Sequence, residues 1–553
     1  TRFASSENLN SQAKAYPPSP FSWPTRTFHL SCADLWNASE RKHPPERVPR
    51  SQPLHSTENS PTITNFVMAT RFIPTIGLEV HVQLKTRSKM FCACAVEYGA
   101  EPNSNTCPVC LGFPGALPVM NEAALRMTAL TGLMLNCRIA DICKWDRKNY
   151  FYPDMPKNYQ ISQYDQPICI GGGVPLPDLA YPKDAQKNIV NPGKTVQLTR
   201  IHLEEDVAKS SHFETNTGID FNRAGTPLME IVSEPDISNP EEAFAYLSSL
   251  QQILVYGGVS DADMEKGQMR CDCNVSVRPE GSDTLGTKIE IKNMNTISGV
   301  RRALAFEIQR QIEVLSSGGK LQQETRRWDD DAGQTFLMRV KEDAHDYRYF
   351  PDPDLLPVDT RVFMDEVRSQ RPELPDEKRQ RFEKDYGITP YDASVLASDR
   401  GLADFFESGA KTSQRPKQLA NWVLNDLQSA LAASDRSIAE SPITASQIDA
   451  LTGLIDSGTI NGKQGKEVFA DMIGSGKDPS VIVEEKGLKQ ESDLGAIEAL
   501  CRQVMDANPK PVAEYKAGKT ASINFLKGQV MKMSQGKANP AIAGELLGKL
   551  LAE

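Results

Sequence analysis

The sequence predicts an α+β protein in which a β-rich domain is followed by helices. Between residues 71 and 359, short strand-like runs such as 201–203, 274–278 and 288–291 are separated by Gly and Pro turns. After the proline-rich segment 371–375, apolar residues recur at helical spacing up to the C-terminus. The length suits about three to four domains. We therefore expect a leader over 1–70, an α+β domain over 71–365, a helical linker over 366–405 and a helical tail over 406–553.

Composition narrows the class of protein. The net charge of −10 and the pI near 5.5 argue against a globally basic nucleic-acid coat, so any nucleic-acid role must be regional. Eleven cysteines in 553 residues are too few for a secreted disulfide scaffold, which favours a reducing compartment. No apolar run reaches the roughly 18 residues of a transmembrane helix, so we expect no membrane span.

Residues 1–70 differ in composition from the rest of the chain. They contain nine prolines, many serines and scattered basic residues, without a sustained hydrophobic period. Such a segment cannot bury enough apolar surface to order itself. Its Ser and Arg content is typical of an organelle transit peptide, although transit peptides usually avoid acids such as Glu7 and Asp34. We predict a mitochondrial address, with another organelle or a plain disordered extension as the alternatives.

The first structured element expected is a strand over residues 76–84. Its alternation places Leu78, Val80 and Val82 on one face and Glu79 and His81 on the other. A carboxylate and an imidazole on a stiff strand can share one divalent cation. The alternative is an ordinary solvated polar face, which is common on strands of this type.

Four cysteines follow in two close pairs. Cys92 and Cys94 precede Cys107 and Cys110 by twelve residues, which is an arrangement that can wrap four thiolates around a tetrahedral zinc ion. Four thiolate ligands close the coordination sphere, so the site would be structural rather than catalytic. The alternatives are four free thiols or a redox pair formed by Cys107 and Cys110.

Several helices have recognisable ends. Asn121 can cap a helix over 122–135, and Asn239 precedes a Pro and two acids at the start of another. Thr444 and Gln447 form a capping box, with Gly458 just beyond the end of that helix. Another helix is expected between Ser492 and the Asn-Pro pair at 508–509.

Two further acidic segments complete a candidate cation site. Residues 203–206 read Leu-Glu-Glu-Asp after a strand-like run, and Glu230 lies inside the apolar run 228–232. A carboxylate in such a run needs a cation or hydrogen-bond donors. Oxygen ligands with one imidazole suit a Mg²⁺ ion that holds the phosphates of a nucleotide. Taken singly, each cluster could equally be a salt bridge or a solvated turn.

Phosphate binding does not follow the P-loop pattern. Both Gly-Lys-Thr segments, at 193–195 and 518–520, lack the glycine that the loop requires upstream. Basic residues of the α+β domain, among them Lys148, Lys157 and Arg223, could instead line an anion pocket or form ordinary ion pairs. The sequence also contains no Gly-x-Ser-x-Gly elbow or other recognisable acyl-transfer nucleophile.

The C-terminal segment is locally basic. Residues 510–549 contain seven lysines and two glutamates, in a chain with a net charge of −10. Such a polarised segment fits an RNA backbone, or it is a solvated face of small helices. The positions expected to contact RNA are Lys527, Lys532, Ser534 and Lys537.

These motifs together resemble the B-subunit of the glutamyl-tRNA(Gln) and aspartyl/glutamyl-tRNA amidotransferases. The resemblance extends from about residue 71 to 553 and depends on many long sequence motifs that occur in the same order as in the family. The motifs are IGLEVHV (76–82), EPNSNT (101–106), DRKNYFYP (146–153), YQISQ (159–163), LEED (203–206), DFNRAGTPLMEI (220–231), SEPD (233–236), DYRYFP (346–351) and GQVM (528–531).

The resemblance implies a glutamine-synthetase-like cradle domain and a YqeY-like helical tail that binds tRNA. It implies that ATP phosphorylates the γ-carboxylate of glutamate on tRNA(Gln), and that ammonia then displaces the phosphate. His81, Glu205 and Glu230 would be Mg²⁺ ligands, with Glu79 at a neighbouring metal position, and Lys148 and Lys157 would line the ammonia channel.

The resemblance also implies partner proteins. A separate amidase (glutaminase) subunit would hydrolyse glutamine, which would explain the missing nucleophile, and the pair would be braced by a small third subunit. The competing hypothesis is a scaffold that binds zinc and tRNA without phosphoryl transfer. The presence of Glu79, His81, Glu205 and Glu230 argues against that hypothesis.

Overall fold

The computed structural model describes residues 71–340, 347–489, 494–534 and 538–552. The leader expected over 1–70 and the predicted tRNA contact Lys537 lie outside the described residues. Among the helices of these ranges, none combines the length and the apolarity needed to cross a membrane.

The strands are β1 (Phe72–Gln83), β2 (Arg138–Ile139), β3 (Ile142–Cys143), β4 (Asp146–Asn149), β5 (Tyr159–Ser162), β6 (Cys169–Ile170), β7 (Gly173–Pro175), β8 (Thr195–Glu205), β9 (Lys209–His212), β10 (Thr217–Asp220), β11 (Pro227–Ser233), β12 (Met269–Pro279), β13 (Ile289–Met294), β14 (Glu324–Asp329), β15 (Gln334–Val340), β16 (Phe350–Pro351) and β17 (Val358–Asp359). The strand-like runs at 201–203 and 274–278 lie in β8 and β12, as predicted, and the run at 288–291 overlaps β13, which begins one residue later.

Within the described part of the chain, thirteen strands form one mixed sheet. Its main path runs β15-β14-β13-β12-β1-β11-β8-β5-β4-β16, while β2, β6 and β7 attach beside β8. Neighbouring strands on this path are antiparallel except β13 and β14. The long strand β1 therefore lies inside the sheet, between β12 and β11.

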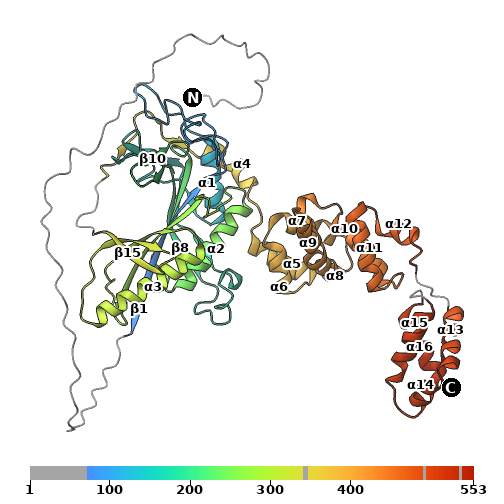
Figure 1. Ribbon diagram of the computed structural model, residues 1–553. Helices are drawn as coiled ribbons and strands as arrows, with labels where there is room; N and C mark the ends of the chain where they lie inside the picture. The colour runs from blue at the N-terminus through green and yellow to red at the C-terminus, as the bar shows by residue number, and fades with distance from the viewer. Residues whose placement is uncertain (1–70, 341–346, 490–493, 535–537, 553) are drawn as a thin grey trace, which may run out of the picture. The chain divides into compact units, whose positions relative to one another are not determined.

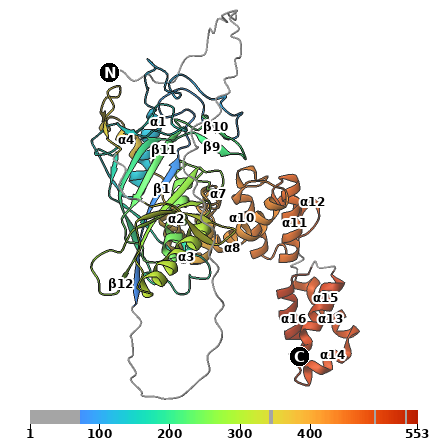
Figure 2. The same ribbon diagram turned by 60° about the vertical axis from the view of Figure 1, so that its left-hand side comes forward.

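One face of β1 is core and the other carries polar groups, as the alternation predicted. Ile76, Leu78, Val80 and Val82 are at most 1% exposed. Helices α1 (Glu122–Met134), α2 (Pro240–Tyr256) and α3 (Ile297–Ser316) lie against the sheet (Figures 1 and 2). Asn121 and Asn239 cap α1 and α2 through their side chains, which confirms both predicted helix starts.

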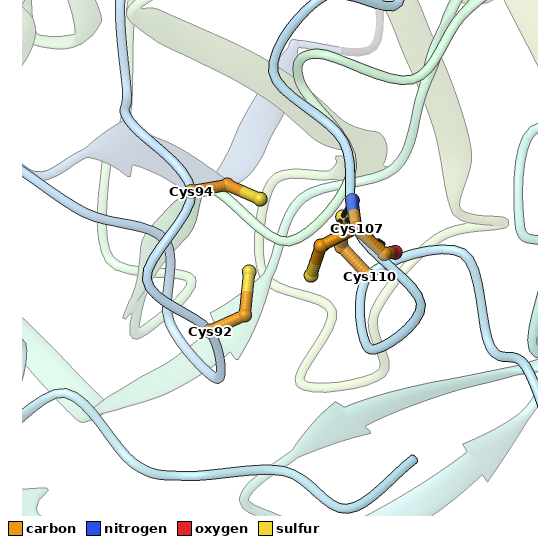
Figure 3. A group of neighbouring side chains, drawn as sticks. All are labelled: Cys92, Cys94, Cys107 and Cys110. Atoms are coloured by element: carbon orange, nitrogen blue, oxygen red, sulfur yellow. Dashed lines mark hydrogen bonds between the residues drawn. The ribbon is translucent and has the colours of Figure 1, made fainter. Parts of the chain in front are cut away.

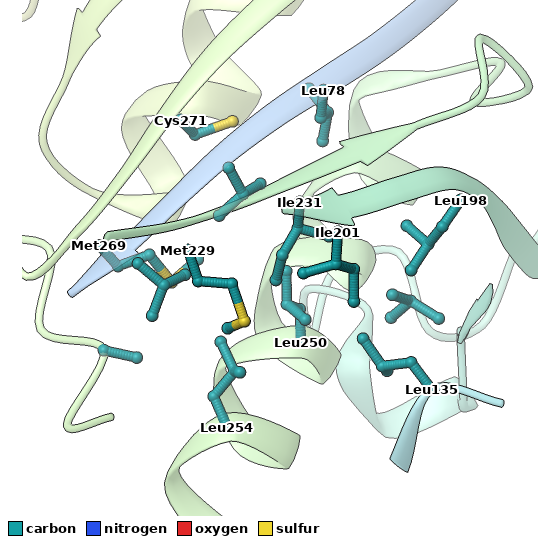
Figure 4. Close-up of a cluster of buried hydrophobic side chains, with 14 of the residues drawn as sticks. Leu78, Leu135, Leu198, Ile201, Met229, Ile231, Leu250, Leu254, Met269 and Cys271 are labelled. Carbon is teal, nitrogen blue, oxygen red and sulfur yellow. The ribbon is translucent and has the colours of Figure 1, made fainter. Parts of the chain in front are cut away.

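The chain between β1 and α1 contains bends and turns, and it carries the four cysteines on two neighbouring loops (Figure 3). On the core side of the sheet, Leu250 and Leu254 of α2 pack beneath the strands that carry Ile201, Met229 and Ile231 (Figure 4). The sheet is therefore held from one side by apolar contact with the helices. Polar side chains of the same strands point to the opposite side.

The helices after the sheet are α4 (Arg361–Ser369), α5 (Pro375–Tyr386), α6 (Pro390–Ala397), α7 (Arg400–Ala410), α8 (Pro416–Asn421), α9 (Gln428–Ala433), α10 (Ala445–Asp456), α11 (Gly462–Ser475), α12 (Pro479–Glu485), α13 (Leu494–Ala507), α14 (Pro509–Lys516), α15 (Ser522–Met533) and α16 (Pro540–Ala552). Short 3₁₀ or π turns occur at η2 (Asp178–Ala180), η3 (Trp422–Leu427) and η4 (Ile438–Glu440). Thr444 and Gln447 form the predicted capping box of α10.

The described residues contain three hydrophobic cores. The first includes Phe363 and Met364 of α4, the second extends from Phe382 to Val483, and the third lies among α13–α16. The helical linker expected over 366–405 is therefore not a separate unit in this structure. Its helices α5–α7 share the second core with α8–α12, because their apolar faces meet the faces of those later helices.

Candidate active site

Strand pairing places a row of polar side chains across the sheet. Arg270 of β12, His81 of β1, Glu230 of β11 and His202 of β8 lie opposite one another on consecutive strands. Because side chains directly opposite each other share a face of the sheet, all four project to the same side. Residues far apart in the sequence thus form one surface.

Three side chains at this surface could hold a cation. One ligand atom from each of His81, Glu204 and Glu230 lies within 4.8 Å of the others. The His81 Nε2 atom is 3.5 Å from Glu230 Oε2 and 3.9 Å from Glu204 Oε1. The other oxygen of Glu204 is buried without a hydrogen bond. Two carboxylates and one imidazole fit a divalent cation such as Mg²⁺.

The electrostatics of this cluster are those of close opposite charges. Burial alone would lower the pKa of His81, but the carboxylates of Glu230 and Glu204 raise that pKa to about 9. Burial alone would raise the pKa of Glu230, whereas His202 and His81 hold it well below its usual range. The buried carboxylates therefore favour a positive charge at this position.

Glu79 lies on β1 two residues before His81, which is a member of the cluster. It faces Asp272 across the β1–β12 pair, and Asn274 donates a hydrogen bond of 2.8 Å to it. Burial, followed by the charges of Glu230 and Asp272, raises the pKa of Glu79. The structure thus places Glu79 beside the cluster but outside its three ligands.

A small pocket continues from Glu79 along the same strands. Its volume is about 230 Å³, and it is lined chiefly by apolar atoms of β1, β11, β12 and the loop at 285–288. Gly77 lines the pocket without a side chain, and a Cβ atom there would lie 3.7 Å from Cα of Pro235. The pocket is smaller than the roughly 300–1,000 Å³ of a complete ligand site, so it suits one part of a larger ligand.

The structure does not bring Glu205 together with His81 and Glu230. Glu205 accepts hydrogen bonds from the Ile161 backbone and from Lys157, and Glu204 occupies the position at the cluster. The physical reason is a β-bulge. Val232 pairs with Arg200, whereas Ser233 pairs with Leu198, so the alternation of β8 changes phase between these residues.

The two lysines predicted for an ammonia channel lie in different surroundings. Lys148 Nζ is 3.9 Å from the Glu204 carboxylate and 5.1 Å from the centre of the Tyr347 ring. Burial opposes its charge, but Glu204, Tyr349 and Glu230 together outweigh burial and raise the pKa of Lys148. Lys157 instead pairs with Glu205. Lys148 therefore lies beside the cation cluster, whereas Lys157 pairs with the neighbouring glutamate outside it.

Arg223, the predicted phosphate contact, braces the turn after β8. Its guanidinium donates to the carbonyl oxygens of Val207 and Ala208 at 2.9 and 2.8 Å, and lies 3.7 Å from Asp206. Arg270 lies in the same row as His81 and donates to Asp206 at 2.9 Å. Sequence reasoning missed Arg270 and His202, because only strand pairing shows that they face the site.

The four cysteines converge as their spacing predicted. Cys92 and Cys94 on one loop point toward Cys107 and Cys110 on the other, and their sulfur atoms lie within 4.8 Å of one another (Figure 3). The thiols shift one another's pKa in opposite directions. A hydrogen bond from Cys92 and the nearby Lys89 ammonium help lower the pKa of Cys110 to about 4, against the effect of burial. The same hydrogen bond and burial raise the pKa of Cys92, and burial raises that of Cys94 to about 11. The convergence of the four sulfur atoms is therefore the observation that favours a metal site.

The tail residues predicted to contact RNA are on or next to α15. Lys527 is partly buried and Lys532 is exposed. Ser534 follows the helix and donates to the carbonyl of Met531 at 3.2 Å. Because it is a serine, it adds no positive charge to an RNA-binding surface. The described tail thus presents Lys527 and Lys532 from one helix.

Comparisons with known proteins agree with this architecture. A family model described as the GatB/GatE catalytic domain matches residues 74–364, and one described as the GatB domain matches 404–551. The sheet domain and the helical tail each match a model of this family, so the chain belongs to the GatB class of proteins.

Three similar proteins carry the same name. The B-subunit of the aspartyl/glutamyl-tRNA(Asn/Gln) amidotransferase from Methylacidiphilum infernorum is 58% identical over 480 residues, which cover 86% of this chain and 98% of the relative. Proteins of the same name from Carboxydothermus hydrogenoformans and Persephonella marina are 51% and 49% identical, and 86% and 87% of this chain is aligned with 98% and 99% of theirs. The chain belongs to this B-subunit family of tRNA-dependent amidotransferases.

Proposed function

We propose that this chain converts glutamate esterified to tRNA(Gln) into glutamine in an ATP-dependent reaction through a γ-phosphoryl intermediate. The observation that carries the proposal is the His81–Glu204–Glu230 cluster, which includes the two central members of the polar row and lies near a small pocket. The relatives' name supports a misacylated tRNA as the substrate.

The chemistry accounts for the need for ATP. A carboxylate is a poor acyl donor at neutral pH until one of its oxygens becomes a phosphate leaving group. A cation held by His81, Glu204 and Glu230 would supply charge neutralisation between the phosphoryl group and the acceptor carboxylate. The pocket beside Glu79 provides apolar surface that can bind part of the nucleotide. Arg270 provides a positive charge in the same row of side chains as His81.

Ammonia is proposed to arrive from a partner. The family name supports a heteromeric enzyme, in which an amidase partner releases ammonia from glutamine and the assembly is braced by a small third subunit. Lys148 and Lys157 support a polar route, because each lies beside one of the adjacent glutamates at the end of β8. The four cysteines are proposed to hold a structural zinc ion, since their sulfur atoms converge.

A reconstituted assay tests the proposal. The full-length chain with its partner proteins receives ATP, Mg²⁺, ammonium and Glu-tRNA(Gln), and both phosphate release and Gln-tRNA formation are measured. We expect both products in equal amounts. Binding of tRNA without either product would mean that the chain is a scaffold and would overturn the proposal.

The cation affinity of the cluster is expected to depend on pH. Because the pKa of His81 is raised to about 9, a metal ion must displace a proton from the imidazole at pH 7. The apparent affinity for Mg²⁺ should therefore rise about tenfold per pH unit between pH 7 and pH 9 and level off above it. Calorimetric titration at each pH measures this rise.

Substitution His81→Gln supplies the control for that titration. It removes the titrating ligand but leaves both carboxylates, so Mg²⁺ should bind more weakly and with little dependence on pH. A wild-type affinity that stays constant from pH 7 to pH 9 would contradict the assignment of His81 as a ligand.

The tail is expected to contribute to tRNA affinity. Helices α13–α16 share the third core, so a deletion should remove residues 490–553 together rather than cut within the core. We expect weaker tRNA binding, with unchanged ATP hydrolysis in the absence of tRNA, measured by filter binding across a salt series. Replacing Lys527 and Lys532 by Ser should reduce the salt slope by about 1–2.

Lys549 provides a matched control in the tail. Its ammonium already pairs with Glu545 at 2.8 Å, so Lys549→Ser should leave the salt slope nearly unchanged. Equal effects from Lys549 and from the pair on α15 would show that the tail acts through general charge alone.

The mitochondrial address is likewise proposed from the composition of residues 1–70. Fusing these residues to a fluorescent protein should direct it to mitochondria. Delivery to another organelle, or retention in the cytosol, would overturn this proposal without affecting the proposed chemistry.

A further inference from the structure

Lys89 lies between the cysteine cluster and the loop that leads into β11. Its side chain is fully buried, and its Nζ atom is 3.6 Å from Cys110 Sγ and donates to the carbonyl of Phe221 at 3.1 Å. A lysine is rarely buried completely unless its charge has partners. The sulfur of Cys110 and the carbonyl of Phe221 supply those partners, so one ammonium connects the two segments.

Further hydrogen bonds fasten the same two segments to each other. The backbone N–H of Met90 donates to Gly225 at 2.7 Å, and the N–H of Phe221 donates to the Asn103 side chain at 2.7 Å. Asn222 accepts from the backbone of Asn105 at 2.7 Å. The loop between β10 and β11 is thus attached to residues before the first cysteine pair and between the two pairs.

The second cysteine loop also touches the Lys157–Glu205 pair. Gly112 has a positive φ of 67°, and a Cβ atom there would lie 2.5 Å from Cγ of Lys157. The backbone of the loop therefore packs directly on Lys157. From the other side, a Cβ atom at Gly225 would lie 3.6 Å from Cβ of Cys110 and 3.9 Å from the Glu205 carboxylate.

We propose that the metal held by the four cysteines positions the Lys157–Glu205 pair, and that Lys89 is the positioning residue that couples them. Four thiolates around Zn²⁺ carry two net negative charges, and the buried ammonium of Lys89 offsets part of that charge. Loss of the metal would free the loop at 107–112 that supports Lys157. The role in ammonia delivery rests on the proposed function, whereas the coupling itself does not.

Metal affinity gives the first test. In the full-length chain loaded with Zn²⁺ or Co²⁺, Lys89→Met should weaken binding about 10–100-fold in competition with a chelator. Lys85→Met is the matched control, because Lys85 is exposed and pairs with Asp261 at the surface. Unchanged affinity in Lys89→Met, or an equal loss in both variants, would overturn the role of Lys89.

Backbone hydrogen exchange in the wild-type chain gives a second test that does not require any variant to fold. Removing the metal should speed exchange in residues 157–162 and 220–226, and reloading should reverse the change. Residues 445–485, in the second core, serve as the internal control. Exchange that changes only next to the cysteines would overturn the proposed positioning.

Kinetics in the assembled enzyme separate positioning from general destabilisation. Lys89→Met should raise the KM for ammonium several-fold while leaving the KM for ATP unchanged, because ATP is proposed to bind on the other side of β8. A fall in kcat alone would overturn the link to ammonia. If the wild-type enzyme forms no Gln-tRNA, the proposed function fails, yet the metal and exchange experiments still decide the coupling.

Discussion

Glu204→Gln is expected to slow phosphoryl transfer strongly, whereas Glu205→Gln should leave cation binding intact. Glu204 offers one oxygen to the cluster with His81 and Glu230, and glutamine keeps its shape while removing its charge. Loss of several kcal/mol of transition-state stabilisation corresponds to a decrease in turnover on the order of 10²–10³-fold. Phosphate release with Glu-tRNA(Gln) and Mg²⁺ affinity measure the two effects, and tRNA binding should not change.

The neighbouring substitution is the matched control. Glu205 pairs with Lys157 on the opposite side of the strand, so Glu205→Gln leaves a buried ammonium without its counter-charge. We expect a loss of stability of about 3–5 kcal/mol, visible as a lower thermal midpoint, with Mg²⁺ affinity retained. If Glu205→Gln removed Mg²⁺ binding and Glu204→Gln did not, the assignment of the cluster would be wrong.

Removing the cysteine-bound metal is expected to have the second large effect. A metal present at about a thousand times its dissociation constant stabilises the folded state by about 4 kcal/mol. The double substitution Cys107→Ser and Cys110→Ser should remove that stabilisation and lower the thermal midpoint of the sheet domain by roughly 10 °C. Elemental analysis should show one zinc per wild-type chain and none in the variant.

A pair of cysteines far from the cluster controls for the loss of thiols. Cys271 and Cys273 are buried neighbours on β12, and their sulfur atoms are 4.0 Å apart. Replacing both with Ala should cost packing energy but leave the zinc content at one per chain. Zinc that persists after Cys107 and Cys110 are replaced would contradict the proposed site.

Local sequence patterns predicted much of the fold. The alternation in β1 determined which face carries Glu79 and His81, because successive side chains of a strand point to opposite sides. Capping residues such as Asn121, Asn239 and Thr444 determined where helices begin, because they satisfy backbone donors within three residues. Each of these features depends on neighbours along the chain.

The division of the helical region was less predictable. A composition change near residue 371 indicated helices, but it did not show that α5–α7 share a core with α8–α12. Which amphipathic faces pack together depends on distant partners, and similar apolar stripes occur on all of these helices. Only the tertiary structure defined the second and third cores.

By itself, the sequence determined the convergence of the cysteines and the polar face of β1, since both follow from short spacings. Only the tertiary structure decided that Glu204, rather than Glu205, joins His81 and Glu230. The alternation seen at Val196 and Leu198 would place Glu205 on the site face, but the bulge at 199 reverses it. A bulge depends on pairing with another strand, so it is invisible in the local period that sequence analysis uses.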